Sequence, residues 1–428
     1  MEPERTDHAT KQRAVFSLTS PHLFSIVVAI FTFPIILSSL PVADYGKWQF
    51  VLALQAWAIT LSAPQITSGS KRGLSLGQDG TFFFALFKRG TFMLFPSAMF
   101  LLLGTFFLCS EKTEFGLLCF VSSFYLFFNI LLQESIADFL IAKKSFVAHG
   151  IWSVLTSPVA RIGSSMVAFF TQSIVLFSLF QVGYAFLVSL VGLAVLIRMN
   201  GLWEQFKRKH YDVSCFRFGI RSMPIDALGA LSSRLIDILI GILFGLSSLA
   251  YFSVARDLRN QIVSIFKISF PLLYADFAKQ PLDQLTSLVK KRMPRMIATS
   301  TLLGGLGLLA GVGYITLFLP KEFLSVIPLF AILSLAFPVG IPTIVLSTVL
   351  QSHLRYRAIA IATSIPNLFE IMLISLLGWL NGIPGMVLAI ALYGYISFLF
   401  FYLAVIKRES FKKVLEQRKL LRTLMEIY

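Results

Sequence analysis

Long hydrophobic stretches separated by short polar breaks make up most of the chain. Stretches of about 20 residues, the length of helix that crosses a hydrocarbon layer, recur between Phe24 and Ile406. Since a backbone inside lipid must satisfy its own hydrogen bonds, each stretch predicts a helix. Twelve spans are predicted, at residues 22–40, 47–68, 91–109, 115–133, 147–170, 174–197, 219–244, 249–276, 296–319, 325–350, 358–380 and 385–406.

Composition points the same way. The chain is 56% hydrophobic and 14% charged, with a mean hydropathy of +0.79. An ordinary soluble domain carries roughly 25% charged residues, so a soluble globular fold is excluded. The predicted fold class is an all-α polytopic membrane protein, with about 12 transmembrane helices in two pseudo-symmetric six-helix lobes.

A weak internal repeat supports two halves. Aligning Thr156-Ser157-Pro158 with Ser364-Ile365-Pro366 brings Arg161 and Glu370 to nearly equivalent positions. The first residues, Met1 to Ser20, have mixed charge and no short apolar core before a cleavage site, so they do not predict a signal peptide. The expected organisation is a cytoplasmic N-terminal segment (1–21), an N-terminal lobe (22–197), a basic linker (198–218), a C-terminal lobe (219–406) and a basic cytoplasmic tail (407–428).

The net charge of +16, from 37 Lys and Arg against 21 Asp and Glu, is explained mainly by topology. Alternate breaks between spans are almost free of cations, whereas the other breaks and both tails hold most of them, Lys88 and Arg89 included. Cytoplasmic loops carry the Lys/Arg excess, so both termini are predicted to be cytoplasmic. No nucleic-acid partner is needed to account for the charge. The three Cys and five His residues are scattered and predict neither a disulfide framework nor a metal site.

Five cations remain inside the predicted spans. A Lys or Arg in the middle of a span costs about 2.5–3.5 kcal/mol, so such residues usually face a bundle interior or a water-filled cavity. They are Arg161, Arg234, Arg256, Arg259 and Lys267, and the acids considered as their partners or as coupling groups are Asp226, Asp237, Asp257 and Glu370.

Spans seven and eight place opposite charges at matching depths. Asp237 and Arg256 each lie eight residues from the intervening turn, and Asp226 and Lys267 each lie nineteen residues from it. One interpretation is that both pairs are interhelical bridges that only hold the bundle together. The alternative, that these groups serve transport, stays open.

Arg234 and Arg259 do not fit the bridging interpretation. Each lies eleven residues from the same turn, so two like charges share one level. They should repel unless an anion or Asp257 lies between them. They are therefore the best candidates for an anion site.

Several short motifs resemble a known family. They are Leu40-Pro41-Val42-Ala43-Asp44-Tyr45-Gly46, the segments 234–241 and 251–258, Phe270-Pro271 with Phe277-Ala278-Lys279, and Gly382-Ile383-Pro384-Gly385. In their order and spacing they are similar to the Wzx-type polysaccharide (O-antigen) flippases of the multidrug/oligosaccharidyl-lipid/polysaccharide (MOP) exporter superfamily.

The resemblance implies a MATE-like fold in a bacterial inner membrane and a polyprenyl-diphosphate-linked oligosaccharide as substrate. Arg forks suit phosphate oxygens. Under this hypothesis Arg234, Arg259 and Arg256, assisted by Arg161 or Lys267, hold the diphosphate. The expected partners are this substrate, membrane lipids, a polysaccharide polymerase and a chain-length regulator.

Other functions remain as alternatives. One is a cation-coupled drug exporter of the same superfamily, and another is a peptidoglycan lipid-precursor flippase. Coupling to Na⁺ or H⁺ through Asp226, Asp237, Asp257 or Glu370 is left open. No large hydrophilic loop with a pair of acids is found, so neither an enzyme nor a cofactor is predicted.

Overall fold

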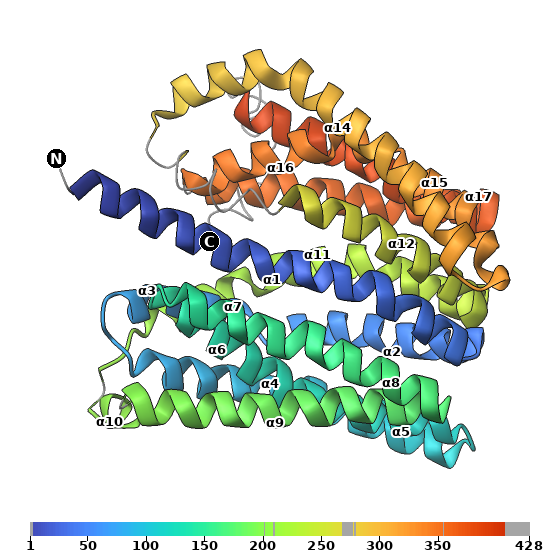
Figure 1. Ribbon diagram of the computed structural model, residues 1–428, viewed down its shortest axis with the longest axis horizontal. Coiled ribbons are helices and arrows are strands. Elements are labelled where there is room, and N and C mark those ends of the chain that lie inside the picture. Colours follow the sequence, from blue (N-terminus) through green and yellow to red (C-terminus); the bar gives the residue numbers. More distant parts are fainter. Residues whose placement is uncertain are drawn as a thin grey trace, which may run out of the picture. The chain divides into compact units, whose positions relative to one another are not determined.

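All regular elements in the described part of the computed structural model are helices (Figure 1). The structure describes residues 3–200, 202–208, 210–267, 277, 280–353 and 355–406. No strand occurs among these residues, so the predicted all-α class is confirmed. The predicted basic tail and the end of the eighth span fall outside the described residues.

The chain divides into two compact units, Met1–Ala230 and Leu231–Tyr428. This division falls inside helix α11 (Ser214–Leu243) rather than in the basic linker. The reason is local packing, since Gly69 lies directly against Cys215 and Phe218 at the start of α11. The part of α11 up to Ala230, more than half of the helix, therefore belongs with the first unit.

The first unit contains six spans, several of them bent or locally rewound. The second span is broken at residues 61–64, where two helices meet at 58° and Ala63 has a φ of 50°. Helix α4 packs along α5, and α8 packs along α9. The elements are α1 (Pro3–Ser39), α2 (Val42–Thr60), α3 (Gln65–Ser75), α4 (Thr81–Cys109), α5 (Thr113–Phe124), the π-helix η1 (Tyr125–Ile130), α6 (Leu131–Ala142), α7 (Phe146–Val154), the π-helix η2 (Leu155–Val159), α8 (Ala160–Thr171), α9 (Ile174–Asn200) and α10 (Leu202–Lys207).

Two sequence boundaries need correction. Helix α4 begins at Thr81, not at residue 91, so Lys88 and Arg89 belong to the helix and not to a loop. Helix α1 begins at Pro3, so most of the segment expected to precede the first span is helical. In both cases the first turns of the helix contain charged residues, and the sequence prediction starts the span after them.

The second unit also contains six spans. The tenth is bent by 51° where α15 meets α16. Spans eleven and twelve are the two helical halves of α17, which are separated by a kink at Gly382, whose φ is 61° and ψ −142°. The elements after α11 are α12 (Leu246–Lys267), α14 (Leu282–Phe318), the 3₁₀-helix η3 (Lys321–Ser325), α15 (Val326–Ser334), α16 (Phe337–Ser352) and α17 (Tyr356–Val405).

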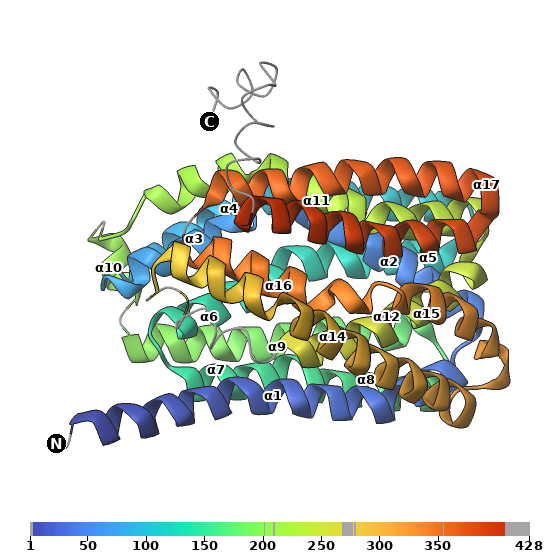
Figure 2. The same ribbon diagram turned by 90° about the horizontal axis from the view of Figure 1, so that it is seen from above.

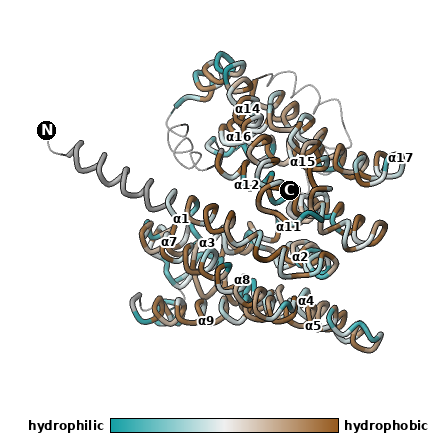
Figure 3. Tube along the Cα trace, turned by 45° about the vertical axis from the view of Figure 1, so that its right-hand side comes forward, coloured by the Kyte–Doolittle hydropathy of each residue, from teal (hydrophilic) through white to brown (hydrophobic). Residues whose placement is uncertain are grey.

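The described helices account for the predicted number of spans. Seven are long and apolar enough to cross a membrane, or nine if each bent pair is one span. Helix α17 has 50 residues and contributes two spans because of its turn. Helices α11 and α12, with 30 and 22 residues, are also long enough to cross a membrane, and both carry several charged residues. Together these make twelve, and Figure 3 shows hydrophobic residues along most of their length.

The turn inside α17 depends on close backbone approach at Gly385. A methyl group there would overlap the carbonyl of Leu377 and approach Asn381. We expect Gly385→Ala to lower the free energy of unfolding by about 1–3 kcal/mol through overpacking. The measurement is thermal unfolding of the purified protein in detergent.

Gly313 provides the matched control. A Cβ at this position meets no atom within 4 Å. Gly313→Ala should therefore leave stability unchanged or raise it by up to about 1 kcal/mol, because Ala favours a helix. Equal effects of the two substitutions would contradict the packing argument.

Candidate functional site

The centre of the candidate site is an ion pair between spans seven and eight. Nη1 of Arg256, on α12, donates to both carboxylate oxygens of Asp237, on α11. Asp237 is completely buried. The Arg256 guanidinium also lies 5.4 Å from the centre of the Phe252 ring, a cation–π distance. The predicted pairing of Asp237 with Arg256 is confirmed.

Arg234 is the more accessible cation of this group. It lies one helical turn before Asp237, and its Nη1 is 3.5 Å from Asp237 Oδ2. Its side chain is 36% exposed, against 13% for Arg256. The Asp237 carboxylate is held mainly by Arg256, so Arg234 keeps donors available for another acceptor.

Glu370 forms the second polar group of the same unit. It lies on the first half of α17, is 5% exposed, and accepts a hydrogen bond from Ser232 of α11. Arg259 of α12 interacts electrostatically with Glu370 and with Tyr393. Arg259 Nε is buried and has no hydrogen-bond partner among the residues that the structure describes.

The two halves of α17 complete this group. The Tyr393 hydroxyl, after the turn, donates to Asn367 Oδ1, before it, over 3.0 Å. Tyr393 also shares a hydrogen bond with Ser397. Asn367 and Ser397 are buried, so the cluster is a polar island within the helices. Such groups are stable inside a low-dielectric interior only when they satisfy one another.

Arg234 and Arg259 therefore have different neighbours. The sequence predicted that these two cations repel unless an anion or Asp257 lies between them. In the structure Asp237 lies beside Arg234 and Glu370 lies near Arg259, and the role of the two arginines in anion binding stays a prediction. Asp257 is partly buried on α12. Asp226 and Lys267, the other pair expected from spacing, have side chains outside the described set.

Arg161 lies in the first unit. It is on α8, directly after the π-helix η2, and is partly buried. The structure gives it no ion pair among the described residues. Its part in substrate binding stays a prediction.

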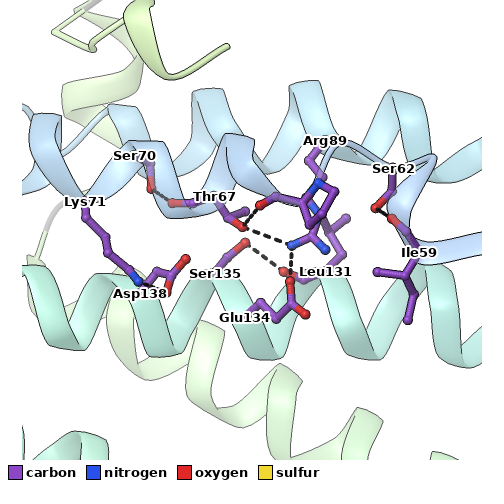
Figure 4. A network of polar contacts seen from close by, with 11 residues as sticks. Ile59, Ser62, Thr67, Ser70, Lys71, Arg89, Leu131, Glu134, Ser135 and Asp138 are labelled. Carbon is purple, nitrogen blue, oxygen red and sulfur yellow. Dashed lines mark hydrogen bonds and ion pairs between the residues drawn. The ribbon is translucent and has the colours of Figure 1, made fainter. Parts of the chain in front are cut away.

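The first unit contains a buried arginine, Arg89, which the sequence analysis assigned to a loop. Arg89 is fully buried, pairs with Glu134 of α6 and donates to Thr67 Oγ1 over 3.0 Å (Figure 4). Its Nε and Nη2 have no hydrogen-bond partner in the described part of the chain. Figure 4 also shows Lys71 of α3 paired with Asp138 of α6 over 2.9 Å.

These pairs hold the second half of the broken span two against α4 and α6. Helix α3 is too polar to be held by apolar packing alone, with the sequence QITSGSKRGLS. Two polar contacts on one face, through Thr67 with Arg89 and through Lys71, add to the packing of its buried Ile66 and Leu74. A third, the ion pair of Lys143 with Asp79, fixes the turn that follows α3.

Sequence reasoning missed several of these groups for different reasons. Arg89 could have been found, because the apolar run Phe82–Phe87, separated from it only by Lys88, extends the helix toward Thr81. Ser232, Asn367, Tyr393 and Ser397 carry no such signal, since their meeting depends on how three helices pack. No group of three or more His, Cys, Asp or Glu residues suited to a metal ion occurs among the described residues.

Comparisons with known proteins give a fold. No family model matches the chain, and no curated protein gives a significant match. Among solved structures, a complex of the MATE multidrug transporter DinF-BH superposes with a TM-score of 0.64 at 13% identity, over 92% of this chain and 95% of that one. The eukaryotic MATE transporter AtDTX14 gives 0.58 at 16% identity, over 94% and 96%.

A bacterial example extends the series. A mutant of the Vibrio cholerae MATE transporter VcmN gives a TM-score of 0.57 at 13% identity, over 96% of this chain and 99% of that one. Identities this low establish a shared fold and nothing finer. The chain is therefore a multi-pass membrane protein with the fold of the MATE transporters.

Proposed function

We propose that the chain is a transporter that moves a polyprenyl-diphosphate-linked oligosaccharide from the inner to the outer leaflet by alternating access. One observation carries the proposal. Arg256 donates to both carboxylate oxygens of Asp237, whereas Arg234, at 3.5 Å from Asp237, remains partly exposed. A partly exposed guanidinium is suited to phosphate oxygens. A polysaccharide polymerase and a chain-length regulator are the partners this function implies.

The state of the carboxylates also supports an anionic cargo. A cationic substrate needs a carboxylate that is not already neutralised by the protein. In the second unit Asp237 is paired with Arg256, and Glu370 lies near Arg259. In the first unit Glu134 is paired with Arg89. Binding a cation at any of these acids would first require an arginine to move away.

Drug export is the second candidate, and the structural comparisons favour it. Two of the matching structures are described as multidrug or multidrug resistance transporters. In that case Glu370 is the group we assign to coupling, with Na⁺ or H⁺ displacing Arg259. Ser232, Asn367 and Tyr393 would then supply neutral oxygen ligands or a proton path.

Arg234→Ala and Arg259→Ala, made separately, test the main proposal. Loss of one charge-assisted hydrogen bond to a phosphate costs about 1.5–3 kcal/mol, so we expect substrate affinity to fall roughly tenfold to a hundredfold. Arg234→Lys should retain part of the activity, since the charge stays but the fork is lost. The measurement is surface polysaccharide in a strain that lacks its own flippase and depends on this chain.

Arg355→Ala serves as control, because Arg355 is an exposed cation of the same unit. Its surface polysaccharide should equal that of the unmodified chain at equal expression. Normal polysaccharide in both the Arg234 and Arg259 variants would overturn the proposal. Efflux of a cationic fluorescent dye from vesicles, driven by a sodium or proton gradient and abolished by Glu370→Gln, would establish drug export instead.

A further inference from the structure

Aromatic and basic side chains gather where the sixth span ends. Helix α10 packs on α4 and α9, and Figures 1 and 2 both show it beyond the end of α9. Trp203 and Phe206 of α10 meet Phe83 and Phe87 of α4, with ring centres 5.2–6.0 Å apart. We name this surface the α10 face; it consists of Phe87 and Lys88 on α4 together with Trp203, Phe206, Lys207 and Arg208.

The α10 face is open to its surroundings. Trp203 is 41% exposed and Phe87 is 52% exposed, although both are large and apolar. Leu202, by contrast, is completely buried and anchors α10 to the unit. The exposed rings therefore do not result from a loosely attached helix. They form the outer layer of a packed aromatic cluster.

Lys207 lies against these rings, and two further cations, Lys88 and Arg208, directly follow Phe87 and Lys207 in the sequence. Lys207 Nζ lies 5.6 Å from the Trp203 ring, and Lys88 Nζ lies 5.5 Å from the Phe216 ring. Lys88, Lys207 and Arg208 are exposed, and none has an ion pair among the described residues. Glu204 of α10 is an exposed acid beside them, and Asp79, whose N–H donates to Gln205 Oε1, is paired with Lys143, so the face keeps a net positive charge.

The position along the span identifies what meets this face. Helix α9 is uncharged and mostly apolar from Ile174 to Ile197 and then reaches Arg198, so its end marks the border between hydrocarbon and water. Trp side chains are enriched at this depth, where lipid headgroups lie. Lys and Arg next to an anionic bilayer surface each gain about 1 kcal/mol from anionic lipids. An apolar ring beside a free cation matches both the acyl glycerol and the phosphate of one lipid.

We propose that the α10 face is a binding site for an anionic glycerophospholipid. Its phosphate lies among Lys88, Lys207 and Arg208, and its glycerol backbone lies on Trp203 and Phe87. The bound lipid holds α10 in place on the first unit. Because α10 precedes α11 in the chain, the lipid also restrains the position from which the connection to α11 starts. The site is independent of the residues assigned to substrate transport.

The test uses the purified full-length chain in a neutral detergent. Phosphatidylglycerol should raise the midpoint of thermal unfolding in a saturable way, whereas phosphatidylcholine should not. In Lys88→Gln/Lys207→Gln/Arg208→Gln the affinity for phosphatidylglycerol should fall at least about tenfold. The unfolding midpoint of this variant in phosphatidylcholine should stay at the value of the unmodified chain.

Lys290→Gln/Lys291→Gln/Arg292→Gln is the matched control, because it removes the same charge from an exposed part of α14. It should keep the response to phosphatidylglycerol. An equal loss of the phosphatidylglycerol response in both triple variants would mean that net charge alone causes the effect, and it would overturn the proposed site. Stabilisation by inorganic phosphate alone would also overturn it, because a free anion would then suffice.

Discussion

Asp237→Ala should lower the free energy of unfolding by about 3–5 kcal/mol, since it leaves a buried cation without its partner. Arg256 is 13% exposed and has little access to water. Arg234 cannot replace the lost carboxylate as a partner for Arg256. It is itself a cation, and it lies only one helical turn from position 237. The measurement is thermal unfolding in detergent, with folded yield from size-exclusion chromatography.

A double variant separates stability from transport. Asp237→Asn/Arg256→Met removes both charges, and replacing a buried pair by uncharged groups of similar volume is often neutral. We expect most of the lost stability to return while surface polysaccharide stays low. Glu322→Gln, at an exposed acid of the same unit, should change stability by less than about 0.5 kcal/mol. An unfolding midpoint of Asp237→Ala equal to that of the unmodified chain would contradict the burial argument.

The pairing at the centre of the site was predictable because depth is encoded in sequence. A residue's distance from a turn fixes its level in an antiparallel helix pair, and Asp237 and Arg256 each lie eight residues from the near end of the turn between Gly245 and Ser248. The same count set Arg234 level with Arg259. It could not reveal that Arg259 approaches Glu370, because that depends on the rotation of α12 and on the position of α17.

The number of spans was predictable for a similar reason, since hydrocarbon thickness sets helix length. The places where spans break were not. The break at Ala63 and the turn at Gly382 have positive φ values that composition does not specify. Arg89 shows the limit most clearly, because a charge at a helix end looks the same in sequence whether it faces headgroups or a buried Glu134 carboxylate oxygen.

Glu134→Ala should destabilise the protein far more than Arg89→Met, although both break the same ion pair. The Arg89 side chain is fully buried and the Glu134 side chain is 46% exposed. Removing Glu134 leaves a buried guanidinium whose remaining bond is to Thr67, at a cost of about 3–5 kcal/mol. Removing Arg89 leaves a carboxylate that water can solvate, and Met fills most of the vacated volume, so we expect a change within about 1.5 kcal/mol.

Thermal unfolding of both variants measures this asymmetry, with Glu114→Ala as control. Glu114 is 53% exposed and pairs with Lys47, which is 24% exposed. Water reaches both partners there, so the control should cost less than about 1 kcal/mol. If Arg89→Met proves the more damaging change, the arginine must contribute through contacts other than its charge. The polar contacts of α3 would then count as consequences of packing, and the apolar contacts of Ile66 with Ala63 and Ala85 would hold the broken span in place.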